Sequence, residues 1–284
     1  MSHKNKESLV KQVTDELGRK ARFGQSKYEA KKDGSYLGGI YSIGTMKSYR
    51  KQCVAFAKYC KEKHKCKTLK SCREYVDEYL KHRSELSPYT VKLDAAALAK
   101  LYSCSTKDFA PTFPRHRADI KRSRGEAARD KCFSEANNAE LVAFCRSTGL
   151  RRHEIEALRG TDLKEENGQV YVHVRRGKGG KERYARVIGD AAAVVALMKS
   201  AGDGKVFPKL PTKADIHGYR REYATTFYRQ IARPVETLKR EEKYFCRRDL
   251  CGVVYDRCAM LEVSRSLGHD RVDVIAGHYL YGKE

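Results

Sequence analysis

Apolar residues in the first part of the chain recur at spacings of three and four positions, the period of an amphipathic helix. The pattern begins at Ile43 and returns over residues 69–80 and 90–101. Ser87-Pro88 marks the start of the last of these helices. A further short helix is predicted over residues 8–17. These segments predict a small helical domain.

The second half of the chain changes between helical and strand periodicity. Val170–Arg175 alternates and is rich in valine, so it is predicted to be a strand. Gly177–Lys181 predicts a tight turn, and residues 183–188 the return strand. Helices are predicted around this hairpin over residues 134–145, 152–159, 190–201, 217–232, 256–267 and 270–280. The predicted fold class is mainly α with a small antiparallel β-sheet, an α+β architecture.

These patterns divide the 284 residues into four parts. Residues 1–40 are a polar N-terminal lead that contains the first short helix, and residues 41–114 are the helical domain. Residues 115–131 form a basic linker, and residues 132–284 form the α+β domain. The length is sufficient for two ordinary domains with substantial cores.

Charge is the feature of the composition that adds most to this picture. The 59 lysines and arginines outnumber the 36 aspartates and glutamates, which gives a formal net charge of +23. Residues 1–125 carry 29 basic and 13 acidic residues, a net +16, whereas residues 126–284 carry 30 and 23, a net +7. Such an excess favours binding to the phosphate backbone of a nucleic acid. We therefore interpret the basic linker as a segment that lies along DNA, in preference to a merely solvated connection.

Other features narrow the setting of the protein. The first 24 residues are polar and charged, and the longest apolar run, Ala191–Met198, is far too short to span a membrane. We expect a cytoplasmic, nucleoid-associated protein whose ten cysteines are reduced thiols. Cys246, Cys251 and Cys258 lie near histidines, but no Cys-x-x-Cys pair is present, so no metal site is predicted.

Four short segments carry residues suited to phosphoryl transfer. They are Thr148–Glu154, the turn around Lys178, His217–Arg220, and Leu267–His269 with the tyrosines that follow it. Arginines from two segments can clamp the oxygens of one phosphate, and a histidine three residues before an arginine lies on the same helical face. A lysine can protonate a leaving oxygen, and a tyrosine can form a covalent intermediate. Each of these residues taken alone could equally be a surface, capping or packing residue, so the hypothesis depends on the order in which the four segments occur together.

In this order the segments resemble those of the tyrosine recombinases, which include phage integrases, Xer-type enzymes and conjugative-transposon integrases. Thr-Gly-Leu-Arg-x-x-Glu at residues 148–154 and Leu-Gly-His at residues 267–269 carry the resemblance, which covers residues 136–281. The helical region before them matches the family's core-binding domain in placement and length only. The resemblance implies a core-binding domain followed by a catalytic domain. It also implies DNA cleavage and rejoining through a 3′-phosphotyrosyl link, without a metal or nucleotide cofactor.

The implied site holds two phosphate-binding arginines, two histidines, a general-acid lysine and a supporting acidic residue: Arg151 and Arg220, His217 and His269, Lys178, and Glu154. His217 would assist the arginines and help manage the proton of the nucleophile. His269 would hydrogen-bond the phosphate, and Lys178 would protonate the leaving 5′ oxygen. Glu154 would buttress the site without reacting.

Two tyrosines near the C-terminus compete for the role of nucleophile. In the family the tyrosine follows the Leu-Gly-His histidine by nine or ten positions. Tyr279 is the tenth residue after His269, and Tyr281 is the twelfth. Positions two apart on a helix point to nearly opposite faces, so both hydroxyls cannot reach one phosphate. Tyr279 is therefore the predicted nucleophile, with Tyr281 as the alternative.

The implied partners are double-stranded DNA recombination sites, on two of which the protein would assemble as a tetramer, and an accessory directionality factor. The chain departs from the family in two places. Residues 235–255 lengthen the stretch between Arg220 and His269 and allow a hairpin insertion. The chain ends three residues after Tyr281, which puts docking of a C-terminal segment on a neighbouring subunit in doubt.

Three other functions remain open at this point. A DNA-binding regulator that does not cleave would use the same scaffold, but none of the implied site residues is missing. A type IB topoisomerase would share the chemistry without exchanging DNA partners. A basic RNA-binding protein is a third class, and no ribonucleoprotein motif supports it.

Overall fold

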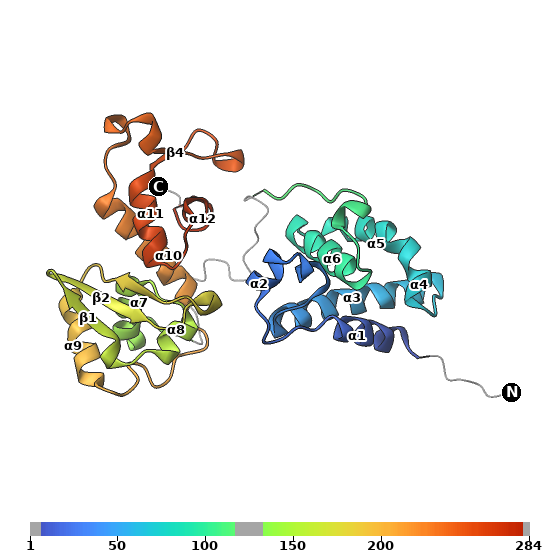
Figure 1. The fold of residues 1–284 in the computed structure, drawn as a ribbon, viewed down its shortest axis with the longest axis horizontal. Helices are drawn as coiled ribbons and strands as arrows, with labels where there is room; N and C mark the ends of the chain where they lie inside the picture. Colours follow the sequence, from blue (N-terminus) through green and yellow to red (C-terminus); the bar gives the residue numbers. More distant parts are fainter. Residues whose placement is uncertain (1–6, 117–132, 281–284) are drawn as a thin grey trace. The chain divides into compact units, whose positions relative to one another are not determined.

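The computed structural model of the protein describes residues 7–116 and 133–280. The chain divides into two compact units, residues 1–125 and 126–284. Figure 1 draws the first unit in blue to green and the second in yellow-green to red. The predicted basic linker falls almost wholly outside the described residues.

The N-terminal unit is built from helices. Its α-helices are α1 (Leu9–Arg19), α2 (Lys27–Lys32), α3 (Ile43–His64), α4 (Leu69–Cys72), α5 (Val76–His82) and α6 (Pro88–Leu101). The Ser42 hydroxyl caps α3 by accepting a hydrogen bond from the Thr45 backbone N–H at 3.2 Å. Pro88 occupies the first turn of α6, where its missing N–H costs no hydrogen bond. Helices α3 and α6 pack together around fully buried Phe56 and Leu98.

The predicted polar lead is packed into this unit. Leu9, Val13 and Leu17 follow one face of α1 and are buried in the same core as α3. Ile40 is also buried, and its backbone forms an isolated parallel bridge with Ala21. Residues 9–40 therefore belong to the helical unit. They are polar overall, but their few apolar residues lie on a narrow face that packs into the core.

The C-terminal unit combines helices with a small sheet. Its α-helices are α7 (Ala139–Thr148), α8 (Arg152–Ala157), α9 (Ala191–Ala201), α10 (Ile216–Ile231), α11 (Arg257–Ser266) and α12 (Val272–His278). They correspond to the predicted helices with small shifts at their ends. Helices α8 and α12 each end two residues before the predicted end, and α10 and α11 each end one residue before it. Helix α7 begins five residues after the predicted start.

A three-stranded antiparallel sheet has the order β1 (Leu163–Glu166), β2 (Gln169–Val174) and β3 (Arg183–Arg186). The predicted hairpin supplies β2 and β3, although a loop of residues 175–182 joins them in place of the tight turn. Strand β1 was not predicted from the sequence. Asn167 and Gly168 have positive φ values of 51° and 73°, which suit the two-residue turn between β1 and β2.

The predicted insertion contains a second, two-stranded sheet. Strands β4 (Lys243–Phe245) and β5 (Val254–Asp256) pair antiparallel, so residues 235–255 do include a hairpin. The Asp256 carboxylate anchors it by accepting from Arg233 Nε at 2.8 Å and from Arg233 Nη2 at 3.0 Å. The hairpin therefore has its own attachment to the end of α10.

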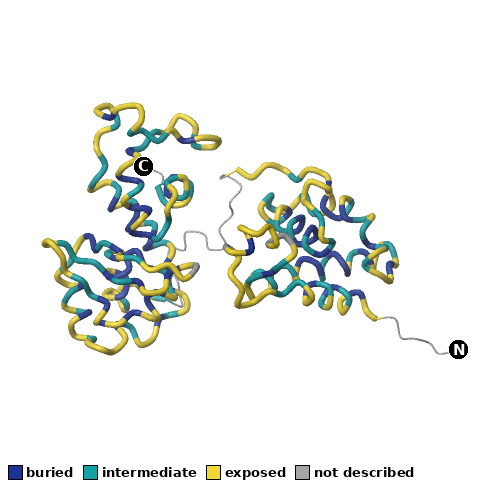
Figure 2. The backbone as a smooth tube through the Cα atoms, viewed as in Figure 1, coloured by how far each residue is buried: buried dark blue, intermediate teal, exposed yellow. Residues whose placement is uncertain are grey.

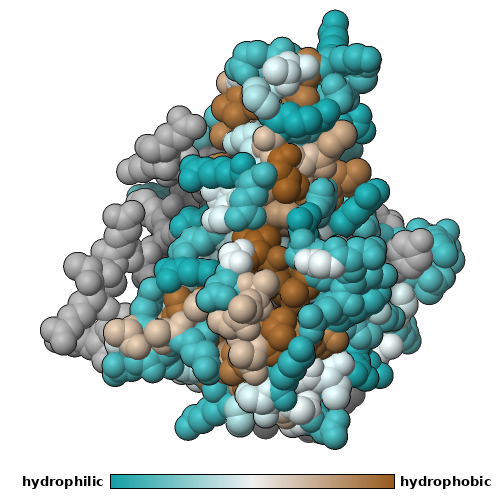
Figure 3. Space-filling model, turned by 90° about the vertical axis from the view of Figure 1, so that its left-hand side faces the viewer, coloured by the Kyte–Doolittle hydropathy of each residue, from teal (hydrophilic) through white to brown (hydrophobic). Residues whose placement is uncertain are grey.

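Two buried clusters hold the C-terminal unit together. One lies between the sheet and helices α7 and α9, and the other gathers Tyr223, Phe227, Met260 and Leu267 from α10, α11 and the residue after α11. Figure 2 shows that buried positions recur along the helices of each unit and that the loops are mainly exposed. Figure 3 shows mostly hydrophilic side chains on one face, divided by an apolar band. Within the described residues, every helix is too short or too polar to cross a membrane.

Candidate active site

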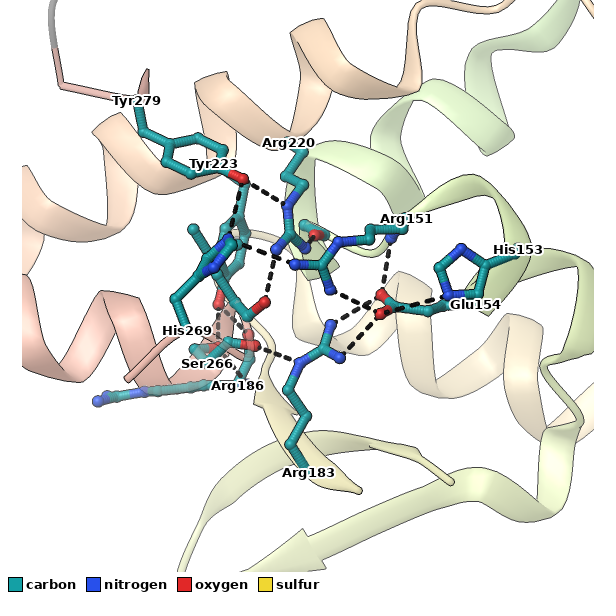
Figure 4. A network of polar contacts seen from close by, with 12 residues as sticks. Arg151, His153, Glu154, Arg183, Arg186, Arg220, Tyr223, Ser266, His269 and Tyr279 are labelled. Atoms are coloured by element: carbon teal, nitrogen blue, oxygen red, sulfur yellow. Dashed lines mark hydrogen bonds and ion pairs between the residues drawn. The ribbon is translucent and has the colours of Figure 1, made fainter. Parts of the chain in front are cut away.

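Four of the predicted site residues meet at one place in the C-terminal unit. Arg151 comes from the start of α8, Arg220 from α10, His269 from the loop after α11, and Tyr279 from the end of α12 (Figure 4). Their side chains are linked in a chain of polar contacts, although 128 positions separate the first from the last. The structure thus unites segments that the sequence analysis grouped only by their order.

Arg151 is placed by the turn between α7 and α8. Gly149 ends α7 with a φ of 60°, and a Cβ there would lie 2.4 Å from the ring of Tyr223. Only glycine therefore suits this position. The chain reverses here, and Arg151 begins α8 with its side chain mostly buried. Its Nη1 donates to Glu154 Oε1 at 2.9 Å, and its Nη2 lies 3.3 Å from His269 Nε2.

Arg220 is the most deeply buried cation of the group, with 1% of its surface exposed. Its guanidinium donates to the carbonyl oxygens of Gly149 and Leu267, and its Nε donates to the Tyr279 hydroxyl at 3.1 Å. Among the described residues no carboxylate pairs with it. Burial lowers the pKa of Arg220 to about 10. A buried cation held only by neutral oxygens favours an anion at its remaining face.

His269 lies between the two arginines and the tyrosine. Gly268 before it has a φ of 70°, and the Ser264 hydroxyl donates to the His269 carbonyl at 2.9 Å, which fixes the loop. Burial lowers the pKa of His269 to about 4, with a further contribution from the charges of Arg220 and Arg151. The imidazole is therefore neutral at physiological pH, with Nε2 directed at the other site residues.

This depressed pKa predicts a pH dependence of stability. The unfolded His269 has a pKa near 6.5, so the unfolded chain takes up its proton first as the pH falls. The stability that neutral His269 contributes is complete above pH 6.5 and is lost as the pH falls towards 4. The free energy of unfolding should therefore drop less between pH 7 and pH 5 in His269→Gln than in wild type. An NMR titration that places the His269 ring near pH 6.5 would contradict this prediction.

Tyr279 directly follows the last residue of α12. Its hydroxyl lies 3.3 Å from His269 Nε2 and 3.1 Å from Arg220 Nε. Because the helix ends at His278, the two tyrosines are not both helical, and the argument from opposite helix faces does not apply. Tyr281 lies outside the described residues, so the structure places only Tyr279 among the site residues.

Glu154 supports Arg151 and is itself held by a residue that the sequence analysis did not select. Arg183 Nη1 and Nη2 lie 2.9 and 2.8 Å from the two carboxylate oxygens of Glu154. Burial alone would raise the pKa of Glu154, but the hydrogen bonds and charges of Arg183 and Arg151 lower it to about 2. The alternation of side chains along β3 is the signal that could have identified Arg183 from the sequence. Arg183 shares its face of β3 with fully buried Ala185, and an arginine on an inward face requires a buried anion.

Lys178 and His217 are less closely engaged. Lys178 is exposed on the loop between β2 and β3, and its charge contributes to the lowered pKa of His269. His217 is exposed on the first turn of α10, three residues before Arg220. Neither side chain makes a hydrogen bond or ion pair within the described part of the chain. Both were predicted to be site residues, and in the described structure neither is part of the polar network of Arg151, Arg220, His269 and Tyr279.

Cys246, Cys251 and Cys258 lie in or just after the insertion. Across residues 7–116 and 133–280, no three histidine, cysteine, aspartate or glutamate side chains gather in a way that could hold a metal ion. The site described above is made from arginine, histidine, tyrosine and one buried carboxylate. Its chemistry is that of a group of anion-binding side chains with a hydroxyl group beside them.

Comparison with known proteins identifies the fold. The sequence matches no protein-family model, and no curated protein matches it in sequence. Among solved structures it resembles the XerH site-specific recombinase bound to palindromic difH substrate in a post-cleavage complex, with 16% identity and a TM-score of 0.55. That match covers 96% of this chain and 93% of the other. The pre-cleavage complex of XerH with difH matches at 15% identity and a TM-score of 0.51, over 96% and 92% of the two chains.

The chain therefore has the α+β fold of the tyrosine recombinases. The predicted fold class, mainly α with a small antiparallel sheet, is confirmed. The resemblance noted in the sequence is confirmed at the level of the fold.

Proposed function

We propose that this protein is a site-specific tyrosine recombinase, an integrase that cleaves and rejoins DNA to insert or excise a mobile element. The observation that carries the proposal is the position of the Tyr279 hydroxyl, 3.1 Å from Nε of Arg220, whose buried guanidinium has no carboxylate partner among the described residues. A nucleophile in contact with an anion-binding cation is the arrangement that attack on a phosphodiester requires.

In the proposed reaction, Arg151 and Arg220 bind the non-bridging oxygens of the scissile phosphate. The Tyr279 oxygen forms a bond to phosphorus as the bond to the 5′ oxygen breaks, which leaves a 3′-phosphotyrosyl link. The hydroxyl proton passes to Nε2 of His269, which lies 3.3 Å away. His217, one helical turn before Arg220, would assist the arginines at the phosphate. The link conserves the energy of the broken bond, so an incoming 5′ hydroxyl can rejoin the strand without a nucleotide.

The N-terminal unit supports the DNA-binding part of the proposal. Four basic residues of α3 line one groove together with apolar residues of α1 and α3: Lys47, Arg50, Lys51 and Lys58. These side chains are part of the net charge of +16 that residues 1–125 carry, and this charge favours contact with a phosphate backbone. We propose that the partners are double-stranded recombination sites, that four subunits assemble on two such sites, and that an accessory factor sets the direction.

The proposed role of Lys178 predicts a specific chemical rescue. If Lys178 protonates the leaving 5′ oxygen, Lys178→Ala should slow cleavage by about 10²–10⁴-fold on ordinary DNA. A substrate with sulfur at the leaving position should restore most of this loss, because a thiolate leaves without a proton. Single-turnover cleavage of the two substrates measures the difference. Equal impairment on both would assign the proton to another group, with Lys181 on the same loop as the next candidate.

The proposed activity is tested by trapping the covalent intermediate. A suicide substrate with a nick near the cut releases a short fragment, so the protein should remain attached to DNA after denaturation. A protein that binds its site but never forms this adduct would be a regulator on the same scaffold. Recombination between two sites, compared with relaxation of a supercoiled plasmid, then separates a recombinase from a type IB topoisomerase.

A further inference from the structure

We infer that Arg183 is a positioning residue of the proposed catalytic site. It connects the Glu154 carboxylate, which binds Arg151, to the two loops that carry Lys178 and His269. This inference rests on the proposed function and extends it to a residue outside the phosphate-binding set. None of the contacts of its side chain is with Arg220 or Tyr279 in the described structure, so its effect passes through the groups that it holds.

The first connection runs through Glu154. Arg183 and Arg151 both bind this carboxylate, whose side chain is fully buried. Oε1 accepts from Nη1 of each arginine at 2.9 Å, and Oε2 accepts from Arg183 Nη2 and the Arg151 backbone N–H, both at 2.8 Å. All the strong donors of this carboxylate are therefore arginine groups. Removing the Arg183 fork would leave the carboxylate held by Arg151 alone, without its two bonds to β3.

The second connection runs to the loop after α11. Arg183 Nε donates to the Ser266 carbonyl at 2.8 Å, three residues before His269. A Cβ on Gly268 would lie 2.9 Å from Arg183 Cδ, so the loop backbone rests directly on the side chain. The position of His269 is thus tied to the same guanidinium that orients Glu154 (Figure 4).

The third connection runs to the loop between β2 and β3. A Cβ on Gly177 would lie 2.9 Å from Arg183 Nη1, and the Gly177 N–H donates to the Lys181 carbonyl at 2.7 Å. The backbone of Gly177, immediately before Lys178, therefore lies against the guanidinium of Arg183. The Arg183 side chain, which is 9% exposed, therefore contacts Glu154 of α8, the loop that carries Lys178, and the loop that carries His269.

The planar shape of guanidinium explains why arginine is suited to this position. Its three nitrogens meet three acceptors in different directions: the two oxygens of Glu154 and the carbonyl of Ser266. A lysine would keep the positive charge but has one nitrogen, which cannot bind the carboxylate as a fork and the carbonyl together. Arg183→Lys therefore removes positioning while it preserves charge.

The test compares first-order rates of adduct formation at saturating DNA. Arg183→Lys should lower this rate by about 10²-fold, the loss typical of a catalytic group displaced by about 1 Å, with little change in DNA affinity. Arg186→Lys is the matched control, because Arg186 lies on the same strand and its side chain binds Glu262 and Gln169 away from the site. Arg186→Lys should cleave at the wild-type rate.

A second measurement separates positioning from loss of folded protein. In a double-mutant cycle, Arg183→Lys should cause a clearly smaller loss of rate in a Glu154→Gln background than in wild type, because the contact with Glu154 is already broken there and only the contacts with the two loops remain to be lost. A purely structural role would instead reduce the amplitude of the reaction and the melting temperature, and its effect would multiply with that of Glu154→Gln.

The possible outcomes bear on the two proposals separately. An Arg183→Lys enzyme that forms adduct as fast as wild type, or whose loss is fully additive with Glu154→Gln, overturns the positioning role and leaves the proposed function intact. A wild-type protein that forms no adduct overturns the proposed function, whatever the Arg183 variants do. Slow chemistry with wild-type affinity and a non-additive cycle supports the inference.

Discussion

Arg220→Ala is expected to slow strand cleavage by about 10³-fold while the protein still binds its DNA site. Loss of one donor to a developing phosphoryl charge costs about 10²–10³-fold in rate, and the buried position of Arg220 places the effect at the upper end. DNA affinity should change little, because the basic residues of the N-terminal unit make many other contacts with the backbone. Single-turnover cleavage and a gel-shift titration measure the two quantities.

The same substitution also removes hydrogen bonds from two buried carbonyl oxygens. Each unpaired carbonyl costs about 1–3 kcal/mol, so a lower melting temperature is expected for Arg220→Ala. Arg220→Lys keeps the charge at the same place, and Arg229→Ala changes an exposed arginine of α10. Cleavage should be severely reduced in Arg220→Lys and unchanged in Arg229→Ala. A folded Arg220→Ala protein that cleaves at nearly the wild-type rate would show that the phosphate is bound elsewhere.

Tyr279→Phe should form no covalent adduct at all. The change removes one oxygen atom and leaves the ring beside Arg220 and His269. Without the hydroxyl there is no group to attack phosphorus, so the loss is complete and does not depend on the substrate. A suicide substrate followed by denaturing electrophoresis detects the adduct, and the variant should bind the same DNA with wild-type affinity.

Tyr281→Phe is the matched control for this experiment, because it makes the same chemical change two positions away. It should form the adduct normally. An adduct that persists in Tyr279→Phe and disappears in Tyr281→Phe would transfer the nucleophile to Tyr281. Adducts in both single variants would place the covalent residue outside this pair.

The four residues that meet in the candidate site could be predicted from the sequence, but only through the joint order of the motifs that contain them. Arg151 and Glu154 stand beside the Thr-Gly break, and Arg220 follows a histidine at helical spacing. These local relations survive folding, so Arg151, Arg220, His269 and Tyr279 meet as the order of the motifs implied. The roles of these residues are still proposals that the variants above test.

Arg183 shows what local patterns miss. It is the third residue of a Lys-Glu-Arg run, which has the appearance of a solvated turn. Its importance comes from Glu154, 29 positions earlier, and from Ser266, 83 positions later. No periodicity within a strand of four residues identifies such partners, although the inward alternation with Ala185 indicates that a partner must exist.

Two parts of the fold were missed for related reasons. Strand β1 reads Leu-Lys-Glu-Glu, which lacks the alternation of a half-buried strand, and the turn at Asn167-Gly168 is the stronger signal. Helix α1 was predicted, but its packing on α3 was not. The sequence of a helix shows that it has an apolar face, but not which other element covers that face. Short elements such as β1, helix ends and long-range partners therefore needed the structure, whereas the order of the longer helices and of the β2–β3 hairpin did not.

The most direct test of the central claim is to identify the amino acid that carries the DNA. The trapped wild-type adduct can be digested with nuclease and trypsin, and the peptide that follows Arg271 contains both tyrosines, separated by Leu280. Tandem mass spectrometry should place the nucleotide 3′-phosphate on Tyr279. A phosphate on any other residue, or no modified peptide after full cleavage of the substrate, would contradict the account.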